Sequence, residues 1–285
     1  MPDFPIARPA SLVTLKILVT PAVKFGARAK RLTLRVAILL NPDGASAASY
    51  SLRHGSYRMT LSKRTALGIS LVVIVLYWIY QIVSQHPDAR LPAHFSEFVW
   101  RIVRTKLLVF AAIFLLLRLE GERFEGIGVN GLQWPKHLGI GLFFGVAMFI
   151  ALNVVLGSAL GSLLPRPAAN GPTIMSFFKE PANLLAWIPI GIFGGGVVEE
   201  LQRIFIFTRF EKWLGRPGLI LGIVFSSVMF GLGHRYQGLG IAIGTGISGL
   251  LLALLYLRRR SALEPIVAHA LSDVLAMLGA TMLAK

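Results

Sequence analysis

The chain has 285 residues, of which 55% are hydrophobic and 15% charged, and its mean hydropathy is +0.68. A water-soluble domain of this length has fewer apolar and more charged residues, so the composition excludes a soluble globular protein and indicates several membrane spans. The formal net charge of +16 does not require nucleic acid as a partner, because anionic lipid and membrane topology account for basic residues in loops. The absence of cysteine excludes disulfides, thiol nucleophiles and thiolate metal sites.

The first part of the chain is a basic segment. Residues 1–64 contain eleven Lys and Arg residues but only two Asp and no Glu, and their longest apolar run, 32–40, is too short to span a bilayer. We expect this segment to be flexible or to lie on the membrane surface. A transit peptide for an organelle is the alternative for such a composition, and Met59 would provide a later start of translation.

Seven apolar stretches follow, and only helices fit them, because they lack the alternation of barrel strands and a helix satisfies its own backbone hydrogen bonds. They lie at about 65–84, 96–117, 137–163, 183–207, 217–236, 239–257 and 263–283. The sequence therefore predicts an all-α polytopic membrane helix bundle of about seven spans. The second stretch is the weakest, because Arg101, Arg104 and Lys106 could place its first half at the membrane interface. We divide the chain into the basic segment 1–64, the first two spans with the next loop at 65–136, and a C-terminal bundle at 137–285.

The distribution of basic residues predicts the orientation in the membrane. Basic residues concentrate in the N-terminal segment and in the loops at 118–136, 209–216 and 258–260, whereas the loops at 85–95 and 164–182 have one and two. We expect the first group to face the cytoplasm, which places the N-terminus inside, in a bacterial inner membrane.

Three groups of polar residues lie inside the C-terminal stretches, where a charged side chain is costly and usually has a function. They are Glu199, Glu200 and Arg203, then Phe230 to His234, and then His269 to Asp273. Arg203 can pair with either glutamate but hardly with both, because it lies four residues after the first and three after the second. The other glutamate then needs a proton, a metal ion or a histidine partner. His269 and Asp273 share a helix face, so Asp273 can orient the imidazole.

These residue types suit hydrolysis. A glutamate can act as general base on water, a histidine can hold that water, and a second histidine can stabilise an oxyanion. Two histidines with carboxylates could instead bind a metal ion such as zinc, which lowers the pKa of bound water. The structural alternatives are a Glu–Arg pair that bridges helices and a glycine cluster, at 191 and 194–196, that allows close helix packing.

The motifs "EELQR", "FGLGH" and "HALSD", in this order on three C-terminal helices, resemble the CPBP family of CAAX-protease and bacteriocin-processing intramembrane proteases, which are related to the Ras-converting CAAX endopeptidase. The resemblance covers residues 137–283. It implies that Glu199 of the glutamate pair is the water-activating base, that His234 assists it, and that His269 and Asp273 support an oxyanion or ligate a metal. Glu200 completes the pair, with Arg203 and Phe230 in supporting roles. The family implies a glutamate or a metallo mechanism; a metal would take Glu199, His234, His269 and Asp273. Membrane lipid and a membrane-bound peptide or protein substrate are the expected partners, and nucleic acid is not.

The sequence departs from the family pattern in two places. Two residues separate Glu200 from Arg203, where the common pattern has three, and one residue rotates a helical side chain by about 100°. Of the residue roles that the resemblance implies, the role of Arg203 is therefore the one that the family pattern supports least directly. An ionised Asp273 accepts hydrogen bonds but cannot donate them, so it suits metal binding or the orientation of His269 better than an oxyanion hole.

The depths of the site residues also differ. Counted from the predicted cytoplasmic ends, Glu199 lies roughly 14 Å deep and His234 roughly 25 Å deep at about 1.5 Å per residue. We favour a fifth span that begins later, after a surface segment near 210–220, because the "RPG" sequence at 216–218 can turn the chain.

Other functions remain as alternatives. A non-proteolytic membrane scaffold or immunity protein could use the same fold. A rhomboid-like serine protease would use Ser248 of "GISG" with His269, but it would leave the glutamate pair without a role. A transporter would use the carboxylates as a proton relay.

Overall fold

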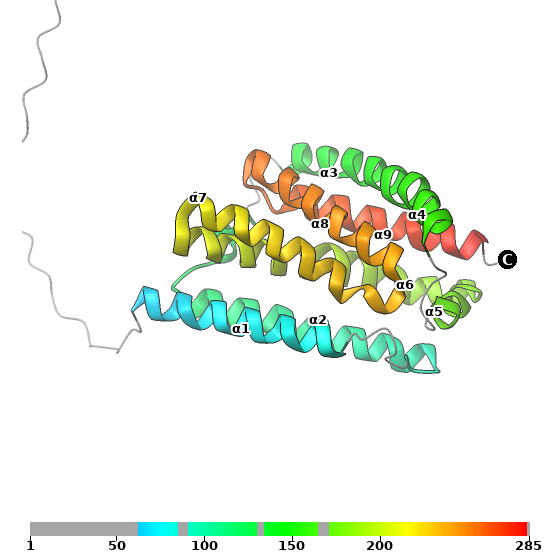
Figure 1. The fold of residues 1–285 in the computed structure, drawn as a ribbon, viewed down its shortest axis with the longest axis horizontal. Coiled ribbons are helices and arrows are strands. Elements are labelled where there is room, and N and C mark those ends of the chain that lie inside the picture. The colour runs from blue at the N-terminus through cyan, green and yellow to red at the C-terminus, as the bar shows by residue number, and fades with distance from the viewer. Residues whose placement is uncertain (1–61, 85–90, 130–133, 165–170, 284–285) are drawn as a thin grey trace, which may run out of the picture. The chain divides into compact units, whose positions relative to one another are not determined.

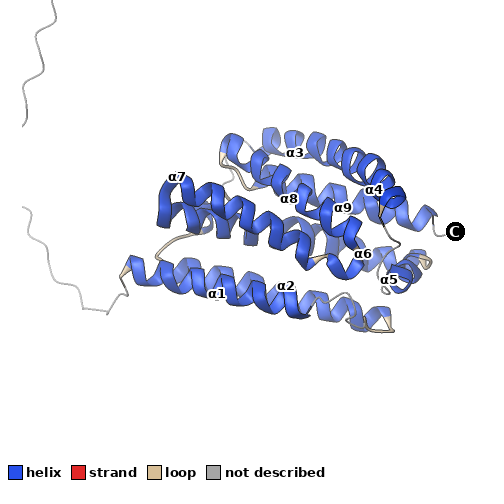
Figure 2. Cartoon of the chain, in the orientation of Figure 1, coloured by secondary structure: helices blue, strands red, loops and turns tan. Residues whose placement is uncertain are grey.

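The computed structural model describes residues 62–84, 91–129, 134–164 and 171–283. Every regular element in these ranges is a helix (Figure 2), which confirms the predicted all-α fold. The basic segment expected at 1–64 lies outside the described residues apart from its last three.

The described helices pack around one long central element, α7. In chain order they are α1 (Lys63–Ser84), α2 (Phe95–Leu119), the 3-10 turn η1 (Phe124–Ile127), α3 (Trp134–Met148), the π-helical η2 (Phe149–Leu156), α4 (Gly157–Leu163), α5 (Gly171–Phe178), the turn η3 (Pro181–Asn183), α6 (Leu184–Pro189), the π-helical η4 (Ile190–Glu199), α7 (Glu200–Gly233), the turn η5 (Arg235–Gln237), α8 (Leu239–Arg259) and α9 (Leu263–Leu283). Figure 1 shows α1 and α2 side by side along one flank, while α3, α8 and α9 cover the other.

Five helical runs in the described residues are long and apolar enough to cross a membrane: Arg64–Ser84, Trp134–Leu163, Pro181–Gln237, Leu239–Arg259 and Leu263–Met282. The third has 57 residues, far more than the roughly 20 that one span needs, and it reverses direction within α7. The helix α2 has the length of a span but carries several basic residues. The membrane helix bundle is therefore confirmed, whereas the number of about seven spans stays a prediction.

The reversal within α7 is a helical hairpin whose turn needs a glycine. Gly215 has φ 67° and ψ −146°, a backbone conformation that residues with a Cβ rarely adopt. Beyond the turn, Gly222 lets the second arm touch the first, because a methyl group there would come within 2.8 Å of Phe207 Cα. The rings of Phe210 and Phe225 face each other across the two arms, with centroids 5.7 Å apart.

The hairpin brings Glu199 and His234 to a similar level. Counted from the turn at roughly 1.5 Å per residue, the first arm reaches about 24 Å to Glu199 and the second about 28 Å to His234. The difference in depth disappears because both arms start from one shared tip, which agrees with the predicted surface segment near 210–220. Within this tip, Glu211 pairs with Arg260 at the end of α8, 2.6 Å away.

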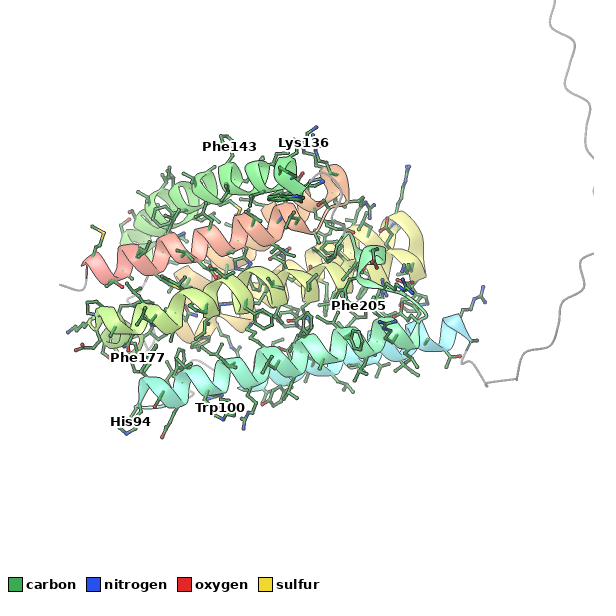
Figure 3. All side chains as sticks on the ribbon, turned by 180° about the vertical axis from the view of Figure 1, so that it is seen from behind. His94, Trp100, Lys136, Phe143, Phe177 and Phe205 are labelled. Carbon is green, nitrogen blue, oxygen red and sulfur yellow. The ribbon has the colours of Figure 1, made fainter. Side chains whose placement is uncertain are left out.

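The first arm of α7 is the centre of the bundle. All its residues from 200 to 209 are buried, and a helix buried on every side requires apolar residues all round or polar ones with internal partners. The outer faces of the neighbouring helices are apolar too. Trp100 on α2 and Phe143 on α3 point away from the bundle (Figure 3) and are 64% and 69% exposed. Large apolar residues on an outer surface are what a lipid environment favours.

Glycines of η4 set this helix close against α9. A methyl group at Gly196 would lie 2.6 Å from Ala270 Cβ, and one at Gly191 would lie 3.0 Å from Met277 Cε. At Gly195 the atoms in the way belong to Asp273 and His269. The predicted close packing of this cluster is therefore present, and it brings Glu199 at the end of η4 and Glu200 at the start of α7 against the middle of α9.

Candidate active site

Glu200 and Arg203 form a buried ion pair in the central arm of α7. Nη1 of Arg203 donates to both carboxylate oxygens of Glu200, at 2.7 and 2.9 Å, and both residues are 1% exposed. Nη2 of Arg203 donates to the backbone carbonyl of Gly249 on α8, and the guanidinium carbon lies 5.1 Å from the centre of the Phe230 ring. The sequence left open which of the two glutamates pairs with Arg203. In the structure it is Glu200, three residues earlier in the same helix.

Glu200 also fixes the orientation of His269 on α9. Its Oε1 lies 2.9 Å from Nδ1 of His269. Because a carboxylate paired with arginine is an acceptor, Nδ1 is the nitrogen that carries a proton in this contact. The other ring nitrogen, Nε2, then faces Asp273 Oδ2 at 3.6 Å and Glu199 Oε2 at 3.8 Å. Both distances exceed a direct hydrogen bond. Glu200, rather than Asp273, is therefore the residue that holds this imidazole.

Glu199 has a partner that the sequence analysis missed. Lys106, on α2, donates to Oε1 of Glu199, and the two side chains are 17% and 16% exposed. The sequence predicts that the glutamate not paired with Arg203 needs a proton, a metal ion or a histidine partner. This prediction is wrong for Glu199, because its partner is a lysine. A signal was present in the sequence, because Lys106 lies three and seven residues before Val109 and Ile113, which places the three on one helix face. Val109 and Ile113 are buried, and so this lysine faces the bundle.

His234 and Phe230 complete the group at the end of the second arm. Nδ1 of His234 lies 2.9 Å from the Phe230 carbonyl oxygen. The Phe230 ring lies edge-on between two imidazoles, with centroids 5.0 Å from that of His234 and 5.7 Å from that of His269. His234 is within electrostatic range of Glu199. All seven residues proposed from the sequence thus come together, from η4, both ends of α7, and α9.

The metal alternative can be compared with the donor arrangement. Among the described residues, no three His, Asp or Glu side chains are placed so that they could share one metal ion. One of the four proposed donors, Glu199, already has one oxygen bonded to Lys106. The residues as arranged do not fit a metal site.

The rhomboid-like alternative requires a contact between Ser248 and His269. Both ring nitrogens of His269 face carboxylates. Gly249, the residue after Ser248, packs against Arg203 rather than against the histidine. The arrangement gives this alternative no support.

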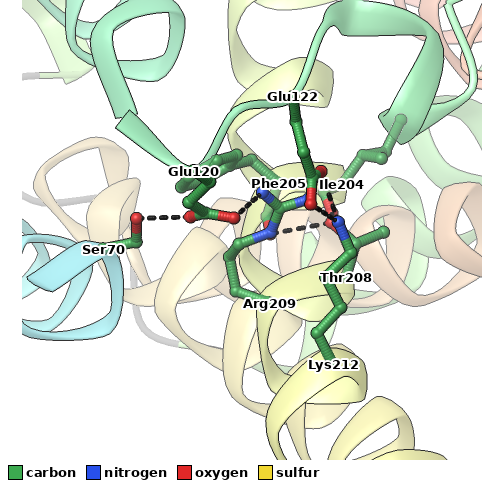
Figure 4. Close-up of polar contacts among 8 residues, drawn as sticks. All are labelled: Ser70, Glu120, Glu122, Ile204, Phe205, Thr208, Arg209 and Lys212. Atoms are coloured by element: carbon green, nitrogen blue, oxygen red, sulfur yellow. Dashed lines mark hydrogen bonds and ion pairs between the residues drawn. The ribbon is translucent and has the colours of Figure 1, made fainter. Parts of the chain in front are cut away.

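A second group of charges, the anchor cluster, joins α1, the end of α2 and the first arm of α7 (Figure 4). It consists of Ser70, Glu120, Glu122, Arg209 and Lys212. Arg209 is fully buried and binds Glu120 at 2.5 Å and Glu122 at 3.0 Å. Ser70 donates to the other oxygen of Glu120 at 2.5 Å, and Lys212 binds Glu122. The loops around 120 and 210, both predicted to be cytoplasmic, therefore lie at one end of the bundle.

Glu122 is the member of the anchor cluster whose ionisation the surroundings change. Partial burial opposes the ionised form, but the hydrogen bond from Lys212 and the charge of Arg209 outweigh it. Together they hold the pKa of this carboxyl below its ordinary value.

The fold and these contacts define a polytopic membrane protein with a carboxylate–histidine cluster enclosed by its helices. Residues 181–275 match the family model described as type II CAAX prenyl endopeptidase Rce1-like. This segment contains all three motifs, and the match confirms the resemblance to a family of membrane proteases that the sequence indicated. No curated protein and no solved structure matches the chain.

Proposed function

We propose that the chain is an intramembrane endopeptidase in which Glu199 activates the attacking water. The observation that carries the proposal is the convergence of Glu199, His234 and His269 from three helical segments. His269 Nε2 faces Glu199 at 3.8 Å, and the rings of both histidines contact Phe230. A base and an oriented imidazole that lie side by side are groups that peptide hydrolysis can use.

The proposed reaction has two steps. Glu199 takes a proton from water, and the resulting hydroxide oxygen bonds to the carbonyl carbon of the scissile peptide. The carbonyl oxygen becomes an oxyanion, and His269 stabilises it by donating from Nε2. The C–N bond then breaks, and Glu199 returns its proton to the leaving amine. His234, within electrostatic range of Glu199, would hold the water before the attack.

The charges of the cluster support a donor role for His269. The carboxylates of Glu199, Glu200 and Asp273 outnumber the permanent cations, Lys106 and Arg203, by one. Because an unbalanced charge is costly away from water, the cluster favours one additional proton. If this proton is on His269, Nε2 becomes a donor while Glu200 holds Nδ1.

The family description supports a first choice of substrate class. Its description names a CAAX prenyl endopeptidase, so a lipid-modified peptide tail near the cytoplasmic face is the first class to test. The wider proposal is a peptide bond in any membrane-associated substrate, which includes bacteriocin leaders.

The test uses purified protein in detergent with a farnesylated, fluorescence-quenched peptide that ends in a CAAX sequence. We expect cleavage by the unchanged protein and a loss of at least about 100-fold in Glu199→Gln and His269→Ala, because general bases and oxyanion donors contribute this much or more. Glu211→Gln removes a carboxylate in the hairpin tip and is the matched control, with an unchanged rate. A chelator should leave the rate unchanged; its loss on chelation would contradict the metal-free route.

The same variants should also be compared on whole membranes, where new peptide termini are identified by mass spectrometry. New termini that depend on Glu199 would support an endopeptidase with another substrate. The alternative of a non-proteolytic scaffold or immunity protein is favoured by one observation, the ion pair of Glu199 with Lys106, which covers one oxygen of the base. Identical termini from the unchanged protein and from Glu199→Gln, together with an uncut peptide, would reject the protease and favour this alternative.

A further inference from the structure

We propose that Lys106, on α2, is a positioning residue that holds the carboxylate of Glu199 ionised and correctly turned for its reaction. Its catalytic consequence rests on the proposed function, whereas the pairing itself does not. Lys106 lies outside the segment 181–275 that matches the family, so the inference comes from the contacts of this chain alone.

The contacts give the two carboxylate oxygens of Glu199 different surroundings. Oε1 accepts from Lys106, and Oε2 points to the side of His269, 3.8 Å from Nε2. A carboxylate held by one oxygen cannot turn away from the histidines without breaking an ion pair that is shielded from solvent. The lysine therefore fixes which oxygen, Oε2, faces His269 and is left to take a proton from water.

The aliphatic part of the Lys106 side chain packs against Gly194 on η4. The position that a Cβ of Gly194 would occupy lies 3.4 Å from Lys106 Cγ and 3.7 Å from Lys106 Cε. A small residue there allows the stem to lie along η4 and its ammonium to reach Glu199, the last residue of η4. Arg101 and Arg104 on the same helix are exposed instead. An inward lysine among spans is costly unless it is paired, which sets Lys106 apart from its basic neighbours.

The charge around Glu199 depends on this lysine. The titratable groups that act on Glu199 come from all the elements around it: Lys106 on α2, Tyr77 on α1, His234 and Tyr236 after α7, and His269 and Asp273 on α9. Of these, Lys106 is the permanent cation. Without it, the cluster would have two more carboxylates than permanent cations, and Glu199 would retain a proton over a wider pH range, which disables a general base.

The catalytic experiment compares Lys106→Met, which keeps most of the stem but removes the charge, with Lys106→Arg, which keeps the charge. Arg104→Met is the matched control, since it removes an exposed charge from the same helix. We expect Lys106→Met to lower the rate of cleavage of the farnesylated CAAX peptide at neutral pH by about tenfold or more, and the acid limb of its pH–rate profile to move to higher pH. Lys106→Arg should restore part of the rate and the original profile, and Arg104→Met should match the unchanged protein. A profile in Lys106→Met that coincides with that of the unchanged protein would overturn the proposal.

A stability experiment tests the pairing without any substrate. Lys106→Met, Glu199→Gln and the double variant are compared by the midpoint of thermal unfolding in detergent. Each single change leaves one member of the pair alone, so we expect the double variant to lose less than the sum of the two single losses. Strictly additive losses would overturn the pairing. If Glu199→Gln cleaves normally but the losses are coupled, the proposed function fails and the pairing stands; if Glu199→Gln is inactive and the losses are additive, the reverse holds.

Discussion

The protein contains two buried clusters of charge on the same long helix, and they differ in balance and in contact distances. In the anchor cluster, two carboxylates meet two cations, and Arg209 binds Glu120 at 2.5 Å and Glu122 at 3.0 Å. In the site cluster, made of Lys106, Glu199, Glu200, Arg203, His269 and Asp273, three carboxylates meet two permanent cations. His269 Nε2 stays 3.6 and 3.8 Å from two of those carboxylates.

Under the proposed function, this difference would separate a structural role of the anchor cluster from a chemical role of the site cluster. A balanced cluster with direct bonds has no proton to exchange, so its contribution is to join α1, α2 and α7. An unbalanced cluster in which His269 Nε2 lies beyond hydrogen-bond distance from two carboxylates keeps a titrating group whose ring nitrogen is not committed to one partner. Both clusters contain buried arginines and glutamates of similar exposure, and so burial alone would not distinguish them. The three predictions below test the comparison from its largest expected effect to its smallest.

Removing Arg209 should damage the fold and spare the chemistry. Arg209→Met leaves Glu120 buried without its cation, and breaking a buried pair in this way costs about 3–5 kcal/mol. We expect a large fall in the midpoint of thermal unfolding, while the folded fraction keeps its rate of peptide cleavage. The double variant Arg209→Met with Glu120→Gln should recover part of the stability. Equal losses of rate and stability in this variant and in Glu199→Gln would show that the two clusters do not have separate roles.

Much of this arrangement could be predicted from the sequence because local spacing carries it. The apolar runs predict the helices, and the motifs at Glu199, His234 and His269 predict which helices meet. The pairing of Arg203 with Glu200 was one of two options that the i+3 and i+4 spacings allowed. The positive-inside pattern placed the loops of the anchor cluster on the same side, and their ion pairs agree with it.

The remaining contacts depend on which helix face each residue occupies and on close packing between helices. The composition of α2 carries neither kind of information. Charge alone predicts one interfacial position for all the basic residues of α2, whereas of Arg101, Arg104 and Lys106 the lysine shares the buried face of Val109 and Ile113. The bond between Glu200 and His269 required η4 and α9 to approach at Gly195 and Gly196. Such an approach depends on which surfaces two distant segments present to each other, and the sequence gives no direct measure of it.

Changing Asp273 should make the site cluster balanced, like the anchor cluster. Asp273→Asn removes the third carboxylate with almost no change in volume, so two carboxylates would meet two cations. We expect the protein to be as stable as before or more stable, because the unbalanced charge of a partly exposed carboxylate is gone. The upper limit of the pH range for cleavage should fall by about one pH unit, because one carboxylate fewer faces Nε2 of His269. The pH–rate profile on the farnesylated peptide measures this, and an unchanged upper limb would show that Asp273 does not act on His269.

The smallest effect should come from Glu122, at the edge of the anchor cluster. Its carboxylate is 26% exposed, so solvent screens its pairs and limits their contribution. Because Lys212 and Arg209 lower its pKa in the folded protein against burial, the folded state favours the ionised form. The stabilisation is present in full above the ordinary value of 4.5 and is lost as the pH falls through the lowered pKa. Glu122→Gln should therefore lower the unfolding midpoint slightly at neutral pH, and the difference from the unchanged protein should vanish as the pH falls from the ordinary pKa through the lowered one. A difference that persists unchanged in acid would mean that Glu122 stabilises the cluster by packing rather than by charge. The balance of charge would then not explain the short contacts of the anchor cluster, as the comparison with the site cluster requires.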